Sequence, residues 1–102
     1  MLDVACGTGR VAIRLARDGT QVVGLDLSKQ MLEVAREKSD GIENIRLAEA
    51  DMRAFDLGAT FGLAIVPGHS FMNLITPQEQ LDCLRCIYRH LEPAAPHARA
   101  PS

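Results

Sequence analysis

The residues best suited to chemistry follow three short apolar segments. Gly7 and Gly9 come after the first segment, Asp26 after the second and Asp51 after the third. Two glycines let the backbone turn tightly and approach a ligand, and a helix after such a turn offers free N–H groups to an anion. Asp26 lies 19 residues after Gly7, where a carboxylate can accept hydrogen bonds from both hydroxyls of a ribose. Asp51 can accept from an exocyclic amine such as that of adenine. Together they predict a ligand that contains adenosine.

Alternating strands and helices would bring these residues to one edge of a sheet. Hydrophobic periodicity and turn residues predict strands over residues 1–5, 21–25, 45–48 and 61–66. They also predict three helices, over residues 11–18, from the cap at Ser28 to a stop at 40–41, and from the cap at Thr76 onward. Strands that alternate with helices form a parallel sheet, whose ligands bind at the carboxyl ends of the strands.

The last of these helices has the clearest start. Thr76 and Glu79 have the spacing of a capping box, with Pro77 at the first helical position. We expect the helix to bury one apolar face, made of Leu81, Leu84, Ile87 and Leu91.

Cysteine and histidine side chains suggest further chemistry that we do not expect. Cys83 and Cys86 lie within this helix without a second Cys/His pair at zinc spacing, so they are expected to pack. Cys6 lies in the glycine turn and is not expected to act as a nucleophile. His90 lies late in the helix, where a cation would interact favourably with the helix dipole.

Composition restricts the class of protein. The 102 residues fit one domain, and 47% of them are hydrophobic, which is too many for a disordered chain. No apolar run approaches the length of a membrane span, and a net charge of −2 leaves no basic stripe for nucleic acid or an anionic membrane. The three cysteines are an odd number with no secretory signal before them. We therefore expect a soluble cytoplasmic α/β domain.

Two families share the short glycine pattern. Residues 7–12 satisfy the dinucleotide fingerprint G-x-G-x-x-G/A. The run Leu2–Arg10, however, resembles the first motif of the class I S-adenosylmethionine-dependent methyltransferases, in which an acid precedes the glycine turn. Residues 23–28 resemble the second motif of that family and residues 50–52 the third. Residues 91–93 resemble the start of the turn before its fifth strand, so the resemblance covers residues 1–93.

The resemblance implies residues at the methionine end of the cofactor S-adenosylmethionine. Asp3, Ala5, Gly7 and Gly9 would line the methionine moiety, and the loop backbone would hold its ammonium and carboxylate groups. The backbone at Val66–Pro67 would close the site near the methyl group.

It implies a second set of residues at the nucleoside end. Asp26 would bind the ribose hydroxyls, while Leu27 and Met31 would sandwich the adenine. Asp51 would accept from the adenine amino group, and the Met52 N–H would reach a ring nitrogen.

The sequence departs from the family pattern at two positions. Ala5 stands where many members have glycine, which a slightly wider turn would tolerate. Gly62 stands where the family usually has aspartate after Phe61. That aspartate is more often structural than catalytic, so its loss is expected to weaken the start of the fourth strand.

The implied fold is an α/β, Rossmann-like parallel sheet of order 3-2-1-4 with helices on both faces. It is incomplete relative to the seven-stranded family fold, so residues 1–93 would be a partial methyltransferase domain, its cofactor-binding half, and residues 94–102 a disordered tail. The fourth strand would then be an exposed apolar edge that could pair with another copy of the chain.

The implied reaction is direct in-line attack of an acceptor, expected to be a small molecule, on the sulfonium methyl. Such a reaction needs no protein nucleophile and no metal, and we assign no catalytic residue. His69 could be a general base or a polar loop residue, and Arg10 could pair with the cofactor carboxylate or be a solvated helix residue. Two alternatives stay open: a non-catalytic fragment that binds S-adenosylmethionine or a nucleoside, and a fragment of an NAD(P)-binding oxidoreductase. Asp3 and residues 50–52 disfavour the latter.

Overall fold

The computed structural model describes residues 1–92, apart from the side chains of residues 68 and 69. The tail expected over residues 94–102 lies outside the described residues.

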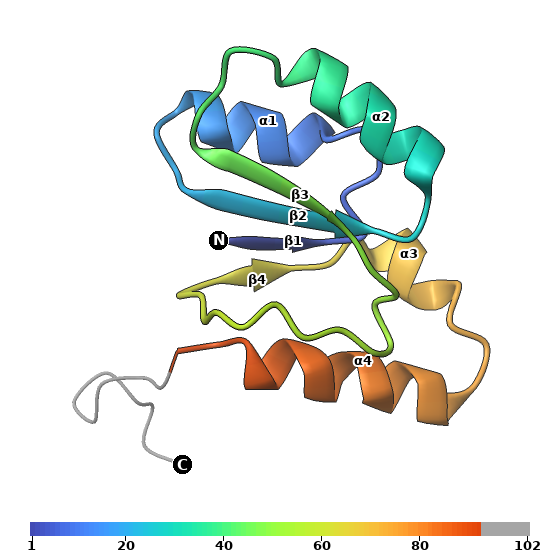
Figure 1. The fold of residues 1–102 in the computed structure, drawn as a ribbon. Helices are drawn as coiled ribbons and strands as arrows, with labels where there is room; N and C mark the ends of the chain where they lie inside the picture. The colour runs from blue at the N-terminus through green and yellow to red at the C-terminus, as the bar shows by residue number, and fades with distance from the viewer. Residues whose placement is uncertain (93–102) are drawn as a thin grey trace.

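A four-stranded parallel sheet forms the centre of the fold (Figure 1). Its strands are β1 (Leu2–Val4), β2 (Val22–Asp26), β3 (Ile45–Glu49) and β4 (Ala64–Ile65). The spatial order is β3-β2-β1-β4, as predicted. Since all strands run in the same direction, the carboxyl ends of β1, β2 and β3 meet at one edge of the sheet.

Helices cover both faces of the sheet, also as predicted (Figure 1). The helices are α1 (Arg10–Arg17), α2 (Lys29–Lys38), α3 (Gly68–Met72) and α4 (Pro77–Arg89). Helices α1 and α2 lie on one face, and α4 lies on the other with the loop that follows β3. The expected caps are present: Ser28 Oγ accepts from the Met31 N–H, and Thr76 and Glu79 form the capping box. The sequence did not predict α3, which begins where the Pro67–Gly68 pair ends the fourth strand.

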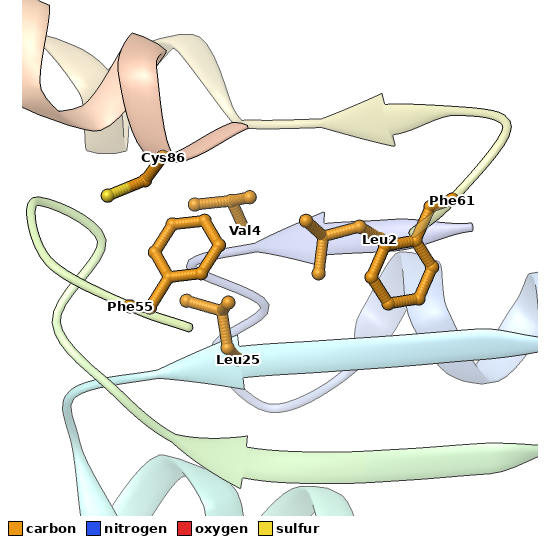
Figure 2. Packing of buried hydrophobic residues seen from close by; sticks show 6 residues of the cluster. All are labelled: Leu2, Val4, Leu25, Phe55, Phe61 and Cys86. Carbon is orange, nitrogen blue, oxygen red and sulfur yellow. The ribbon is translucent and has the colours of Figure 1, made fainter. Parts of the chain in front are cut away.

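The larger core cluster lies between the sheet and α4 (Figure 2). Alternate residues of a strand point to the same face, so Leu2 and Val4 both point into this cluster from β1. Around them pack Leu25, Phe55, Phe61 and Cys86. A smaller cluster of Ala12, Ala16 and Val22 joins α1 to the opposite face of the sheet.

The predicted buried face of α4 was wrong. Leu81 is 42% exposed and Leu84 is 50% exposed, whereas Cys83 and Cys86 are buried. Only Ile87 of the predicted residues packs against the core from within α4. The helix is rotated so that the small thiols, not the leucines, face the cluster around Phe55. The expectation that both cysteines pack is therefore confirmed.

His90 was expected to act as a cation at the helix end, and this was also wrong. It is 4% exposed, and its ring lies on Phe55 with a centroid distance of 4.7 Å. Its Nε2 accepts from the Leu57 N–H at 2.9 Å, and its Nδ1 lies 2.6 Å from the Cys86 carbonyl oxygen. These partners require a neutral ring with its proton on Nδ1. His90 thus joins α4 to the loop before β4.

The fourth strand is shorter than residues 61–66. Regular pairing with β1 covers Ala64 and Ile65, and a single further bond joins the Leu2 N–H to the Leu63 carbonyl. Phe61 instead forms an isolated parallel bridge with Leu91. Leu91, near the end of the described residues, therefore pairs with Phe61 at the outer edge of the sheet.

The exposed position of Gly62 allows a test of its backbone conformation. Among the described residues, a Cβ there would meet only Glu92 Oε2, at 3.8 Å, and the φ of Gly62 is not in the left-handed region. We expect Gly62→Ala to raise the free energy of unfolding by about 0.5 kcal/mol, because alanine restricts the unfolded chain. Gly41→Ala is the matched control: it also has open space but a φ of +84°, so it should lower stability by about 1 kcal/mol. Urea denaturation measures both, and a destabilised Gly62→Ala would contradict the assignment.

Candidate active site

The turn after β1 is built from residues in the left-handed conformation. Gly7 and Gly9 have φ values of +58° and +83°, and Ala5 has a φ of +60°. Ala5 itself therefore adopts the left-handed conformation that favours glycine. That conformation costs an L-residue on the order of 1 kcal/mol. The bond from the Cys6 N–H to the Leu25 carbonyl, at 2.8 Å, ties the turn to the end of β2.

Asp26 joins this turn to the start of α2. Its Oδ2 accepts from the Gly7 N–H at 2.8 Å, and its Oδ1 accepts from the Ser28 N–H at 2.9 Å. Each carboxylate oxygen can accept about two hydrogen bonds. Asp26 is therefore held in place by the backbone and keeps acceptor capacity for a ligand.

Two adjoining cavities lie at the carboxyl ends of the strands. The larger is about 640 Å³ and includes Asp3, Gly7, Met31, Val66 and Pro67 in its lining. The smaller is about 320 Å³ and includes Leu27, Asp51 and Met52. Both are lined by Ala5 and Asp26. The structure therefore brings together every predicted site residue except Gly9.

Gly9 serves packing within the fold and lines neither cavity. A Cβ at Gly9 would lie 3.0 Å from Ile13 Cδ1 and 3.2 Å from Ala35 Cβ. The missing side chain thus lets the start of α1 approach α2.

Leu27 and Met31 are apolar but poorly covered. Leu27 is 63% exposed and Met31 is 46% exposed, each beside a cavity that Asp26 also lines. Exposed apolar side chains at a cavity provide surfaces on which a flat base can pack.

The structure also brings in residues that the sequence analysis did not select. Ser70 and Asn73 line both cavities, and Leu74 lines the smaller one. They come from α3 and the turn after it, which no periodicity predicted. Arg10 lines the larger cavity as an exposed residue. The side chain of His69, considered above as a general base, lies outside what the structure describes.

Asp51 forms ionic contacts that its sequence context did not reveal. Arg53 donates to Asp51 from Nε to Oδ1 at 3.0 Å and from NH2 to Oδ2 at 2.6 Å. Arg53 NH1 also donates to Glu79 Oε2 at 2.7 Å. The guanidinium holds the pKa of the Asp51 carboxyl below its usual range. The network joins the loop after β3 to the first turn of α4.

Residues 1–94 match the sequence model of a family described as "Methyltransferase domain". The chain belongs to the class I S-adenosylmethionine-dependent methyltransferases. This decides between the two families that share the glycine pattern.

Named relatives of this methyltransferase domain support the assignment. The chain is 34% identical over 93 residues to dTDP-3-amino-3,4,6-trideoxy-alpha-D-glucopyranose N,N-dimethyltransferase of Streptomyces venezuelae, covering 91% of this chain and 38% of the relative. It is 32% identical over 93 residues to the cypemycin N-terminal methyltransferase of a Streptomyces species, with 91% and 38% covered. The structure of S-adenosylmethionine-bound CalS10, an amino pentose methyltransferase from Micromonospora echinaspora, matches with a TM-score of 0.82 and 37% identity over 90% of this chain and 38% of that one. The chain thus spans well under half the length of these relatives.

Burial raises the pKa of two acidic groups of the methyltransferase domain. Asp3 is 2% exposed, and burial, with the nearby Asp26 charge, raises the pKa of its carboxyl to about 6. Burial and the charges of Asp3 and Asp26 raise the pKa of the Cys6 thiol to about 12. Cys6 therefore packs as a neutral thiol. Since only a thiolate is a strong nucleophile, Cys6 is not suited to attack a ligand.

No metal or membrane feature accompanies this site in the described part of the chain. Residues 1–92 contain no group of three His, Cys, Asp or Glu residues arranged to hold a metal ion. The helices in the same range are all too short or too polar to cross a membrane.

Asp3 should make stability depend on pH in an unusual direction. Its folded pKa of about 6 exceeds the ordinary value of 3.8, so the folded state binds the proton more tightly. Stability from this group is complete below about pH 4 and is lost as the pH rises through 6. Asp3→Asn should therefore raise the free energy of unfolding at pH 7 by up to about 3 kcal/mol, with little gain at pH 4. Urea denaturation at both pH values measures this.

The exposed Asp40→Asn substitution is the control for that experiment. It should leave the difference in unfolding free energy between pH 4 and pH 7 as in the wild type. An Asp3→Asn variant destabilised equally at both pH values would show that a contact, not desolvation, dominates at Asp3.

Proposed function

We propose that this chain is the cofactor-binding part of a methyltransferase that transfers a methyl group from S-adenosylmethionine to a small-molecule acceptor. The position of Asp26 carries the proposal. It lines both cavities, and its orientation is set by the N–H groups of Gly7 and Ser28. A carboxylate at this place, with free acceptor capacity, suits the paired hydroxyls of a ribose between a base and an amino-acid moiety.

The smaller cavity suits the adenine. Leu27 would pack against the ring from this cavity and Met31 from the adjoining larger cavity, and the Asp51 carboxylate would accept from the amino group of the adenine. The backbone N–H of Met52 would reach a ring nitrogen. The cavity supports this assignment because it combines apolar walls with a carboxylate at one side.

The larger cavity suits the methionine moiety. Asp3 would lie opposite the ammonium group, because its carboxyl is buried and lines this cavity. A cation there would favour the ionised form of this carboxyl. The open space at Gly7, where an added Cβ would meet nothing within 4 Å, leaves room beside the turn. Val66 and Pro67 would line the end near the methyl group.

When bound, S-adenosylmethionine supplies a methyl group activated by its positive sulfur. The residues of this chain then contribute proximity and alignment, which can lower a barrier greatly without a covalent intermediate. The neutral, buried thiol of Cys6 fits a site that uses no protein nucleophile. We assign no general base.

The names of relatives support a small-molecule acceptor, because two of them act on an amino sugar or an amino pentose. The absence of a basic stripe in the sequence argues against nucleic acid. We propose a cytoplasmic location, which the three free thiols support. Self-association through the β4 edge stays a prediction, which a measurement of mass in solution would test.

Binding of S-adenosylmethionine and S-adenosylhomocysteine by isothermal titration calorimetry tests the proposal. We expect micromolar binding of both and none of NAD. Asp26→Ala should weaken binding by about 100-fold or more, because two charge-assisted hydrogen bonds to the ribose are lost. Asp40→Ala is the surface control and should bind as the wild type does.

Circular dichroism must accompany these titrations, because Asp26 also holds the backbone at Gly7 and Ser28. Asp26→Asn, which keeps one acceptor oxygen, is a milder second variant and should give an intermediate loss. A folded wild type that binds neither ligand, or an Asp26→Ala variant that binds as the wild type does, would refute the site. Binding without turnover on any acceptor would instead favour a non-catalytic binding fragment.

A further inference from the structure

We propose that Arg53 is a positioning residue, held from α4 by Glu79, that orients the Asp51 carboxylate toward the adenine amino group. The inference rests on the proposed function and concerns how one side of the site is held. Arg53 is exposed and lies outside every motif that pointed to the cofactor.

The hydrogen bonds of Asp51 leave more acceptor capacity on one oxygen than on the other. Oδ1 accepts from both the backbone N–H of Arg53, at 2.9 Å, and its Nε, at 3.0 Å. Oδ2 accepts from Nη2 at 2.6 Å and also from Nε at 3.3 Å, so the two oxygens share the single Nε proton. Because the shorter Nε bond goes to Oδ1, which also accepts the backbone N–H, Oδ2 keeps the larger share of its acceptor capacity. The carboxylate is therefore fixed with one oxygen available to the cavity that Asp51 lines.

Glu79 fixes the other side of the guanidinium. Its Oε1 accepts from the Thr76 N–H at 3.1 Å in the capping box of α4, which leaves Oε2 to accept from Arg53 NH1 at 2.7 Å. A side chain used by a helix cap has little freedom to move away. Arg53 is thus clamped between two carboxylates, one anchored to a helix and one in the cofactor cavity.

Arginine suits this task better than lysine. Its planar fork can contact two carboxylates in fixed directions, whereas an ammonium is a point charge on a flexible chain. Arg53 and Glu79 both line the same cavity as Asp51, Leu27 and Met52. The three charged side chains therefore form one wall of the space assigned to the adenine.

A double-mutant cycle on S-adenosylhomocysteine affinity tests the inference. Arg53→Met should weaken binding about tenfold in the wild-type background, but less than about twofold in the Asp51→Asn background. Glu79→Gln, which keeps an oxygen for the cap, should weaken binding roughly threefold. Arg53→Lys should recover only part of the loss. Arg46→Met, on an exposed arginine of β3 that lines neither site cavity, is the matched control and should bind as the wild type does.

Base selectivity gives a readout that a purely structural role would not move. A S-adenosylhomocysteine analogue with hypoxanthine in place of adenine presents an oxygen where the amino group was, and a fixed Asp51 carboxylate should repel it. The wild type should prefer adenine by about tenfold or more. In Arg53→Met the carboxylate can turn away, so the preference should fall severalfold.

Three results would overturn the inference. Tighter binding by Arg53→Met would mean that Arg53 competes with the adenine for Asp51. Equal losses in the wild-type and Asp51→Asn backgrounds, or an unchanged base preference, would mean that Arg53 acts on the fold alone. If Arg53→Met does not fold, Arg53→Lys and Glu79→Gln carry the same comparison.

The failure of this inference can be told apart from the failure of the proposed function. If the wild type binds S-adenosylhomocysteine and Asp26→Ala does not, the results above leave the proposed function intact. A wild type that binds nothing would refute both the proposed function and this inference.

Discussion

The site depends on one carboxylate and the two backbone groups that hold it. Asp26 accepts from Gly7 in the turn after β1 and from Ser28 at the start of α2, so it joins two strand ends in one short network. The parallel register makes this possible, because Val4 pairs with Leu25 and Asp26 follows directly. A slip of one residue in β2 would turn Asp26 to the other face of the sheet. The positions of the turn, of α2 and of both cavities therefore share one constraint.

The same part of the sheet holds groups that oppose folding. Burial, and to a smaller extent the charge of Asp26, raises the pKa of the Asp3 carboxyl, and Ala5 adopts a left-handed φ two residues later. Each of these features costs free energy in a small domain whose net stability is limited. A group that is costly for the fold and directed at a cavity is typical of a binding site, where a ligand offsets the cost. Under the proposed function, a bound cofactor would offset the cost of the left-handed Ala5 and of the buried Asp3.

Much of the fold follows from local patterns. The cap at Ser28, the capping box at Thr76 and the residues after each strand were predicted from spacing and residue type, whereas the strand order was implied by the family resemblance. The orientation of α4 was not, because two helical stripes compete on it. Leucine is the more apolar residue, but Cys83 and Cys86 are small enough to let α4 lie against the cluster around Phe55. Periodicity alone does not say which stripe faces the sheet. The short β4 and the neutral His90 likewise depend on tertiary contacts. Phe61 pairs with Leu91 and not with β1, and His90 accepts from the Leu57 N–H.

The sequence predicted the site residues that directly follow the strands. It did not predict Arg53 and Glu79, which line the same cavity. Arg53 and Glu79 are 26 residues apart, and nothing in the sequence around either one indicates the other. Their contact arises because α4 crosses the face of the sheet and brings its capping box to the loop after β3 (Figure 1). The helix that covers the core therefore also reaches the cofactor site. Glu79 stabilises the start of α4, because its Oε1 accepts from the Thr76 N–H. Its second oxygen, Oε2, accepts from Arg53, the arginine beside Asp51. Local helix stability and the geometry of the site are in this way coupled through one carboxylate.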